Sequence, residues 1–341
     1  MDLLPSSDQL ELTSAAAEFF AEQVPIAAIR ARRDEPSALD AKTWVAGAEL
    51  GLLGLSAADG VGGSGLGLDD EALLFRELGR RLVPGPFLAS VLGARVAALT
   101  GSDDLARAIV EGHTVVALAE LRTGSAGPDG VTGRLDLLDP AGSAYLLVVT
   151  EDGAGLVETA AVGLAEPTDS IDPGTRLASA RAEAAPVAAW LPSGQEPLRL
   201  RALVLVSAML VGIAEAVRDQ ASEYARTRVQ FGRPIGVNQA IKHRCADMAV
   251  AAEAALSQTL FAAVALESGR PDAEFQVLAA KIIAGRSALS GAAANIQIHG
   301  GMGFTYEHDA HLYLKRAHVL DLLIGRSADT LGRLLAQEAA Q

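Results

Sequence analysis

Apolar positions recur at helical spacing in the first part of the chain and again in the last. Before about residue 112, stretches such as LTSAAAEFFAEQ and DDEALLFRELGRRL place apolar side chains on one helix face, with glycine-rich breaks between them. From about residue 199 onward, long alanine-rich segments each carry an apolar stripe over several turns. The pattern predicts an N-terminal helical unit and a C-terminal four-helix bundle.

The segment between these helical parts has a different pattern. From Thr114 to about Ser193, short aliphatic or β-branched runs such as VVALAEL and YLLVVT alternate with the turn sequences GPDG, DPAG and EDGAG. The chain is therefore expected to be mainly α with a small, reduced β-domain. The predicted domains are an N-terminal helical domain at 1–113, the β-domain at 114–195 and a four-helix-bundle domain at 196–341.

Composition and charge narrow the classes of function. The chain has 42 acidic and 28 Lys or Arg residues, a formal net charge of −14. Such a surface repels a nucleic-acid backbone and an anionic bilayer, so neither is expected as a partner. The single cysteine, Cys245, cannot form an internal disulfide, and the N-terminus lacks the basic start and apolar run of a secretory signal. We expect a soluble cytoplasmic protein.

The glycines of GVGGSG, residues 60–65, have the spacing of a dinucleotide-binding turn. Such a turn requires a strand before it and an acidic side chain about 20 residues later. The preceding segment DAKTWVAGAELGLLGL has helical periodicity instead, and the required acidic position falls within or just after the next predicted helix. A loop between two helices is the better interpretation.

The segment EHDAH, residues 307–311, offers four potential metal ligands. His308 and His311 lie three residues apart, which puts both on one side of a helix. The rest of the sequence offers no matching ligand pair, so no metal is expected. We interpret the segment as a solvated helix start, with acidic residues near the positive end of the helix dipole.

One basic segment contrasts with this acidic chain. Between Arg226 and Arg244 the sequence has five Lys or Arg residues and no acidic one. Farther along, QIHGGMGFT at 297–305 has glycines whose backbone amides could approach a ligand closely. Arg228 and Arg233 together with these amides would suit a pyrophosphate. Surface ion pairs and a tight turn between helices would explain the same residues equally well.

Both segments resemble those of the acyl-CoA dehydrogenase family. RTRVQFGRPIGVNQAIKHRCADMAV is similar to the first two helices of the family's C-terminal domain, and QIHGGMGFTYEHDAHLYLKRA to its later glycine segment. GLLGLSAADGVGGSGLGLDDEALLFRELG resembles part of the N-terminal domain, and IDPGTRLASARAEAAP the end of the middle one. The resemblance covers nearly the whole chain. It implies a helical domain, a β-domain and a four-helix domain, assembled as dimers or tetramers around FAD.

The resemblance also assigns residues to the cofactor. In the family, the Arg-x-Gln-Phe-Gly and Gln-x-x-Gly-Gly segments of one subunit hold the adenosine diphosphate part of FAD, whose flavin lies mainly in the neighbouring subunit. Matched by position, the residues implied here are Arg228, Gln230, Phe231, Gln239, Gln297, Gly300 and Gly301.

The catalytic base of the family has no counterpart in the expected places. Family members remove an α-proton with a glutamate while a β-hydride passes to the flavin. Most carry it in a Tyr-Glu-Gly triplet, where this chain has Leu323, Ile324 and Gly325. A minority carry it near the start of the first C-terminal helix, where LRLRALVL at 198–205 has no acid. Glu196 and Asp321 both come too early in the alignment.

The flavin-facing side of the β-domain departs from the family as well. Where relatives have Thr-Glu-Pro and then Gly-Ser-Asp, this chain has AELRTGSAGPDG, in which only Glu120 and scattered glycines correspond. The Trp-containing strand that packs against the flavin is missing between Gly133 and Tyr145, and Trp190 comes too late to replace it. The half of the site that reaches into a neighbour is therefore better matched than the flavin-facing half.

This asymmetry resembles one subunit of a heteromeric enzyme. Some actinobacterial acyl-CoA dehydrogenases, including those that act on steroid side chains, are α2β2 heterotetramers in which one subunit type bears the base. The expected function is that of the short, base-lacking subunit, which completes an FAD site with a longer paralogue that carries the glutamate and acts on an acyl-CoA. Two alternatives remain open: a homomeric dehydrogenase using Glu196 or Asp321, and a structural partner that binds no flavin.

Overall fold

A computed structural model describes residues 4–337 of the 341-residue chain. Contacts between residues divide the chain into two compact units. Of the described residues, the bundle unit contains 4–20, Ala72–Val83 and 203–337. The sheet unit contains Ala21–Glu71 and Pro84–Ala202. The three-domain division with boundaries near 113 and 195 stays a prediction.

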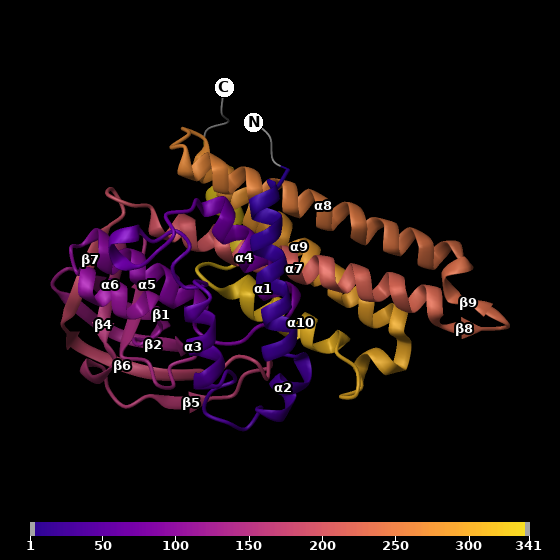
Figure 1. Cartoon of the computed structure of the whole chain (residues 1–341), viewed down its shortest axis with the longest axis horizontal. Helices are drawn as coiled ribbons and strands as arrows, with labels where there is room; N and C mark the ends of the chain where they lie inside the picture. Colours follow the sequence, from indigo (N-terminus) through magenta and orange to yellow (C-terminus); the bar gives the residue numbers. More distant parts are fainter. Residues whose placement is uncertain (1–3, 338–341) are drawn as a thin grey trace. The chain divides into compact units, whose positions relative to one another are not determined.

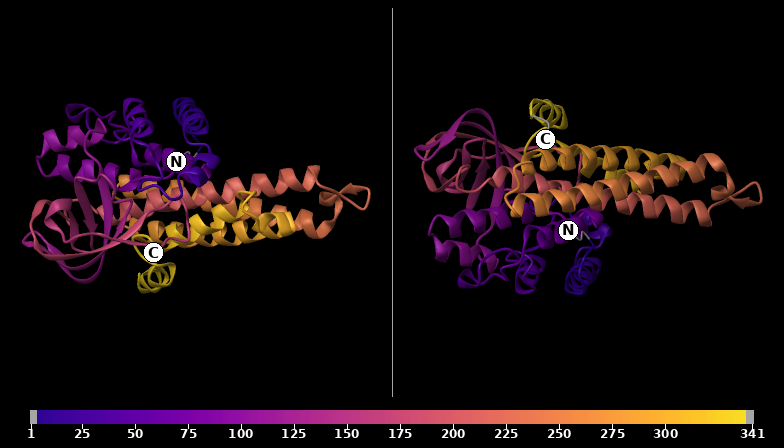
Figure 2. Two further views of the ribbon diagram at one scale, coloured as in Figure 1. Left: turned by 90° about the horizontal axis from the view of Figure 1, so that it is seen from below. Right: turned by 90° about the horizontal axis from the view of Figure 1, so that it is seen from above.

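The bundle unit is built around long antiparallel helices, which Figures 1 and 2 show side by side. Helix α9 is central: it packs against α8 and α10, and a Cβ on its Gly291 would lie 3.2 Å from Val217 of α7. The predicted four-helix bundle is confirmed. Its helices are α7 (Leu198–Thr227), α8 (Gln239–Glu267), α9 (Ala273–His299) and α10 (Ala310–Leu322); α1 (Ser7–Gln23), α4 (Leu68–Arg80) and α11 (Ser327–Ala336) belong wholly or partly to the unit.

Short connections set which ends of these helices meet. The hairpin β8–β9 (Val229–Gln230, Arg233–Pro234) and the 3₁₀ turn η3 (Ile235–Val237) join α7 to α8. The 3₁₀ turn η4 (Gly300–Phe304) joins α9 to α10. Because α7 and α9 both run toward the hairpin end of the bundle, the hairpin and η4 lie at that same end (Figure 1).

Three helices are long and apolar enough to cross a membrane by length and composition alone: 198–227, 239–267 and 273–304. The most apolar window of α7 is 94% buried within the protein, so helix packing accounts for its composition. The corresponding window of α8 is only 39% buried. The structure therefore leaves an apolar face of α8 uncovered.

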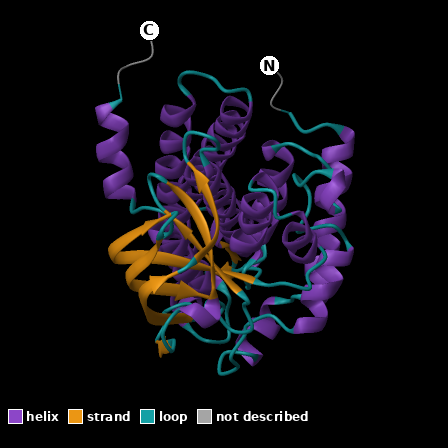
Figure 3. Cartoon of the chain, turned by 90° about the vertical axis from the view of Figure 1, so that its left-hand side faces the viewer, coloured by secondary structure: helices purple, strands orange, loops and turns teal. Residues whose placement is uncertain are grey.

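The sheet unit holds a seven-stranded sheet, drawn in orange in Figure 3. The order of its strands is β5-β6-β2-β1-β3-β4-β7. Among the strands of the described residues, β1 and β3 are the one parallel pair. The buried helix α5 lies against the sheet, where the Ser90 hydroxyl hydrogen-bonds both the N–H and the carbonyl of Val116 at 3.2 Å. The strands are β1 (Val116–Gly127), β2 (Gly130–Leu138), β3 (Tyr145–Val149), β4 (Gly153–Glu158), β5 (Glu166–Thr168), β6 (Leu177–Ala185) and β7 (Val187–Pro192), with the turn η2 (Thr159–Ala161). The helices are α2 (Ile26–Ala31), α3 (Ala41–Glu49), α5 (Phe87–Leu99) and α6 (Asp103–Val110). The predicted fold class, mainly α with a small β-domain, is confirmed.

The glycine-rich segment 60–65 lies in the connection from α3 to α4, which contains the short turn η1 (Asp59–Val61). No strand precedes it in this described segment. A Cβ on Gly63 would lie 2.1 Å from the carbonyl oxygen of Ala57, so this glycine is required by close backbone packing. The interpretation as a helix-to-helix loop is confirmed.

Candidate functional site

The two segments singled out in the sequence lie at the same end of the bundle. The N–H of Arg228 donates to the carbonyl of Tyr224, 2.8 Å away, at the end of α7. The ring of Tyr224 stacks on that of His299, with ring centroids 4.2 Å apart. His299 immediately precedes Gly300 at the end of α9. This stack joins the start of the basic hairpin to the start of the glycine segment.

The tip of the hairpin has an unusual backbone. Phe231 and Gly232 form the two-residue turn between β8 and β9, with φ angles of +52° and +79°. Positive φ at both positions suits a hairpin turn, but it is costly for a residue with a bulky side chain. The Phe231 side chain is 101% exposed, so burial within the chain does not offset that cost. A strained, fully exposed aromatic residue points to a binding role.

The basic side chains near this turn are available to a ligand. Arg228 and Arg233 are exposed, and neither forms an ion pair with any of the residues 4–337 that the structure describes. Arg226, by contrast, lies 3.5 Å from the carboxylate of Glu223. The explanation of Arg228 and Arg233 as members of surface ion pairs therefore finds no support among the described residues.

The glycine segment presents an open backbone. Gly300 ends α9 with φ +62° and ψ −141°, a conformation that favours glycine. A Cβ on Gly300 or Gly301 would meet nothing within 4 Å. A Cβ on Gly303 would instead lie 2.7 Å from the carbonyl oxygen of Ile296. Gly303 serves the turn itself, whereas Gly300 and Gly301 leave room for a ligand against the main chain.

These residues fit the adenosine diphosphate end of FAD. A guanidinium group can bind phosphate through two parallel N–H···O hydrogen bonds, and an exposed aromatic ring can stack on an adenine. Bare glycine backbone allows phosphate oxygens to approach amide N–H groups. Exposed amide side chains add further hydrogen-bond donors and acceptors: Gln230 in the hairpin, Gln239 at the start of α8 and Gln297 in the last turn of α9.

The position of the family's usual base is apolar in this structure as well. Leu323 and Ile324 follow the end of α10, and both are buried. Ile324 has φ +61° and Gly325 φ +140°. No proton acceptor is present in the side chains of Leu323, Ile324 and Gly325.

The two alternative carboxylates are each held by cations. Glu196 lies 2.8 Å from the guanidinium of Arg95 and 4.0 Å from that of Arg201. The Asp321 carboxylate lies 3.8 Å from the ammonium of Lys281, a fully buried side chain that also donates to the Asp321 carbonyl at 2.8 Å.

The segment 307–311 leads into the first turn of α10. Nδ1 of His308 accepts the N–H of Ala310, the first residue of the helix, at 3.1 Å. Groups of three or more potential metal-binding side chains do not occur within the described part of the chain. The interpretation as a helix start is confirmed, but its description as solvated is wrong for His311, which is buried. His311 packs edge-on against Tyr306, with ring centroids 5.5 Å apart.

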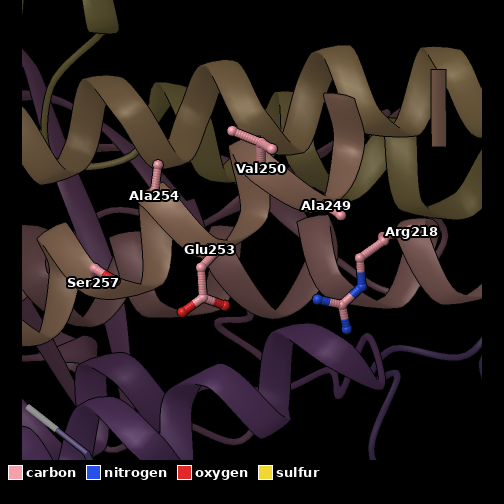
Figure 4. Close-up of a pocket in the computed structure, with 6 residues that line it drawn as sticks. All are labelled: Arg218, Ala249, Val250, Glu253, Ala254 and Ser257. Atoms are coloured by element: carbon pink, nitrogen blue, oxygen red, sulfur yellow. The ribbon is translucent and has the colours of Figure 1, made fainter. Parts of the chain in front are cut away.

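A groove of about 610 Å³ lies along α7 and α8 (Figure 4). Arg218 of α7 and Glu253 of α8 supply its charged side chains, and Arg218 also pairs with Asp219 at 2.8 Å. The other lining residues are small or apolar: Ala249, Val250, Ala254 and Ser257. Val250 is 71% exposed, so this groove is part of the uncovered face of α8. Ser257 and Glu253 are the lining residues that could act as a nucleophile or a base, and no described hydrogen bond joins them to each other.

Comparisons with known proteins identify the family. The model of the acyl-CoA dehydrogenase N-terminal domain matches residues 6–114, and that of the C-terminal domain matches residues 201–337. Acyl-CoA dehydrogenase IpdE2 of Mycobacterium tuberculosis is 34% identical over 342 aligned positions, which cover 97% of this chain and 98% of that protein.

The chain belongs to the acyl-CoA dehydrogenase family.

Solved structures agree with this membership. A variant of the steroid ACAD Tcur3481–Tcur3483 is similar with a TM-score of 0.85 and 26% identity, over 96% of this chain and 97% of that one. The ChsE4–ChsE5 complex of Mycobacterium tuberculosis has a TM-score of 0.87 at 23% identity over the full length of both chains, a similarity of fold. Membership in the acyl-CoA dehydrogenase family implies an oxidoreductase that uses FAD.

Sequence reasoning missed the residues beneath the glycine segment. Tyr224 lies one helical turn before Arg228, and His299 lies within the quoted motif, yet neither was singled out. The one feature of the sequence that pointed to His299 is its position directly before Gly300 and Gly301. Their contact joins residues far apart in the chain, so no local pattern predicts it.

Proposed function

We propose that this chain is the base-lacking subunit of a heteromeric acyl-CoA dehydrogenase, and that it supplies the FAD adenosine diphosphate site to a catalytic partner. One contrast carries the proposal. Arg228 and Phe231 are exposed at the end of the bundle that also carries the open backbone of the glycine segment, whereas buried leucine and isoleucine occupy the usual position of the base. The chain has the outward-facing binding groups without the group that would remove the proton.

In this proposal the chain binds and orients the cofactor. Arg228 and Arg233 neutralise the diphosphate, and the charge-assisted hydrogen bonds fix its position. Gly300 and Gly301 would let the phosphates approach the main chain, and the exposed Phe231 ring would be available to stack on the adenine. Gln230, Gln239 and Gln297 supply further polar contacts. FAD, when bound, supplies the acceptor for the β-hydride of the substrate.

The partner in this proposal is a longer paralogue. Its catalytic glutamate removes the α-proton, and its β-domain covers the flavin. The name of the ChsE4–ChsE5 complex supports an assembly of two different chains. The uncovered apolar face of α8 offers additional surface for such an assembly. We infer an α2β2 heterotetramer in the cytoplasm, where acyl-CoA thioesters are available.

The substrate in this proposal is an acyl-CoA, desaturated between its α and β carbons. The similarity to a protein described as a steroid ACAD favours a steroid-derived acyl group. Because the partner contributes the flavin wall, the pocket that selects the acyl group belongs mostly to that partner.

The homomeric alternative is less well supported, because Glu196 and Asp321 are both engaged by cations. A purely structural role does not explain why the Arg228, Arg233 and Phe231 side chains are exposed. It also does not explain why neither arginine forms an ion pair with a described residue. Each alternative predicts a different response of flavin content to mutation.

Arg228→Ala tests the proposal directly. The variant loses a charge-assisted phosphate contact, so the copurified complex should bind FAD about 10- to 100-fold more weakly. Arg226→Ala is the matched control, since Arg226 is two residues away, carries the same charge and pairs with Glu223. FAD affinity is measured by titration of the apo complex, followed by flavin fluorescence. Equal flavin retention in wild type and Arg228→Ala would refute the assigned role.

Coexpression tests the need for a partner. The chain is produced alone, together with a longer acyl-CoA dehydrogenase paralogue, and with that paralogue carrying its glutamate changed to glutamine. Flavin absorbance should appear in the copurified complexes, and turnover of an acyl-CoA only in the complex with the intact glutamate. Turnover by the isolated chain with added FAD would favour the homomeric alternative.

A further inference from the structure

His299 is buried directly beneath the exposed glycine segment. Its side chain is 5% exposed, although Gly300 and Gly301, which follow it, are exposed. Tyr224 of α7 stacks on the imidazole at 4.2 Å with an interplanar angle of 28°. The ring of His308, from the segment before α10, lies 4.2 Å away at 48°. Three aromatic rings from three parts of the bundle unit thus meet beneath the glycines.

Hydrogen bonds determine which nitrogen of each histidine carries a proton. His299 Nδ1 lies 2.9 Å from the carbonyl oxygen of Asn295, so Nδ1 must be the donor. His308 Nδ1 accepts the N–H of Ala310, which requires that nitrogen to be unprotonated. His299 is therefore oriented by α9, and His308 by the start of α10.

The stack is also tied to the rest of the bundle. The side-chain amide of Asn295, which is fully buried, donates to Gln220 of α7 at 2.9 Å. The Tyr224 hydroxyl lies 4.0 Å from the sulfur of Met302 in η4. A Cβ on Gly303 would lie 3.1 Å from the Cβ of His299. η4 therefore contacts both Tyr224 and His299.

We propose that His299 is a positioning residue, which holds Gly300 and Gly301 in the conformation that binds the cofactor through its contacts with Tyr224 and His308. This inference rests on the proposed function. Glycines have no side chains to restrict their backbone, so ordering them at the moment of binding costs conformational entropy. A buried ring stack that orders the segment beforehand reduces that cost and raises affinity.

The same geometry makes cofactor binding sensitive to acid. Burial lowers the pKa of His299 below its ordinary value of 6.5. The hydrogen bond to the Asn295 carbonyl partly opposes this shift, and the neighbouring His308 adds to it. The titratable groups that contact the imidazole are Tyr224 from α7 and His308 from the segment before α10. Because the folded state binds the proton more weakly, the stack is fully stable above about pH 6.5 and weakens as the pH falls toward the lowered pKa. FAD affinity is expected to weaken over the same pH range.

Two variants of His299 separate positioning from general stability. His299→Ala removes both ring contacts, and FAD affinity of the apo complex should fall about three- to tenfold at pH 7.5. His299→Phe retains a ring for stacking but cannot be protonated, so FAD affinity should stay near that of wild type while its decline below pH 6.5 becomes shallower. FAD titration between pH 5.5 and 8 measures both effects.

Hydrogen exchange of the isolated chain without FAD provides a second readout. Exchange at the amides of residues 300–304 should accelerate in His299→Ala and remain slow in His299→Phe, while the centre of α9 stays protected in both. Faster exchange with unchanged FAD affinity would overturn the positioning role. If His299→Ala fails to fold, an unaltered acid response in His299→Phe would overturn it as well.

A comparison of FAD binding in Arg228→Ala and His299→Ala distinguishes failure of this inference from failure of the proposed function. Weaker FAD binding in Arg228→Ala with no effect of His299→Ala would leave the cofactor site in place and reject the positioning role. Unchanged FAD binding in both variants would reject the cofactor site itself.

Discussion

Gly79 of α4 and Gly212 of α7 bring the backbones of the two helices into contact. A Cβ on Gly79 would lie 1.9 Å from the carbonyl oxygen of Met209, and a Cβ on Gly212 would lie 1.9 Å from that of Arg76. A Cβ essentially never approaches a non-bonded carbonyl oxygen that closely, so each position requires glycine unless the helices move apart. This crossing fixes α7, the helix whose far end leads into the basic hairpin.

Gly212→Ala should destabilise the bundle unit strongly. The methyl group forces α4 and α7 apart, at a cost of about 1–3 kcal/mol or more. Urea unfolding followed by circular dichroism measures the change. Gly332→Ala is the control, because that position in α11 has nothing within 4 Å of the added Cβ and helices favour alanine over glycine. Equal midpoints for the two variants would contradict the tight crossing.

Glu215→Gln should also destabilise the contact between α4 and α7. The buried Glu215 carboxylate accepts two hydrogen bonds from Arg76, at 2.6 and 2.9 Å, and the loss of its charge leaves that guanidinium without its main partner. The expected cost is about 2 kcal/mol. Glu223→Gln, at an exposed pair, should change the unfolding free energy by less than about 0.5 kcal/mol. The prediction fails if both variants unfold at the wild-type urea concentration.

Gly301→Ala should weaken cofactor binding without affecting folding. The added methyl group meets nothing within 4 Å of this chain, and it projects into the space assigned to the phosphates. FAD affinity of the complex should fall by about tenfold, while the thermal midpoint of the isolated chain stays unchanged. Gly332→Ala again serves as the control for a glycine replaced at an open position. Full FAD affinity in Gly301→Ala would place the diphosphate elsewhere.

Glu196→Gln and Asp321→Asn should leave the chemistry intact. Because both carboxylates are held by cations and the base is assigned to the partner, kcat of the complex should change by less than about twofold, well below the hundredfold or greater loss expected for a true base. Steady-state turnover of an acyl-CoA by the complex tests each variant. Loss of activity in one of them, with the complex still assembled, would identify a displaced base in this chain.

Much of the fold follows from local patterns. The alanine-rich segments predicted from about residue 199 onward correspond to α7, α8 and α9. The runs VVALAEL and YLLVVT lie in β1 and β3. The spacing of apolar residues in helices and strands follows from the backbone geometry of each element. It can therefore be recognised in the sequence without knowledge of the packing.

Local sequence patterns do not predict the order of the strands in the sheet. β1 pairs with β2 on one side and in parallel with β3 on the other, and β7 lies at the far edge beside β4. Strand pairing depends on which buried faces fit together over long sequence separations. The alternation of apolar residues is the same for many possible orders.

By itself, the sequence determined the helical and strand segments, the family, the location of the basic and glycine segments, and the absence of an acid at Leu323–Gly325. Only the tertiary structure decided that Arg228 and Arg233 stay exposed, that Glu196 and Asp321 pair with cations, and that Tyr224, His299 and His308 stack together. The first set depends on neighbours along the chain. The second depends on which side chains the packed helices and loops bring within a few ångströms of one another.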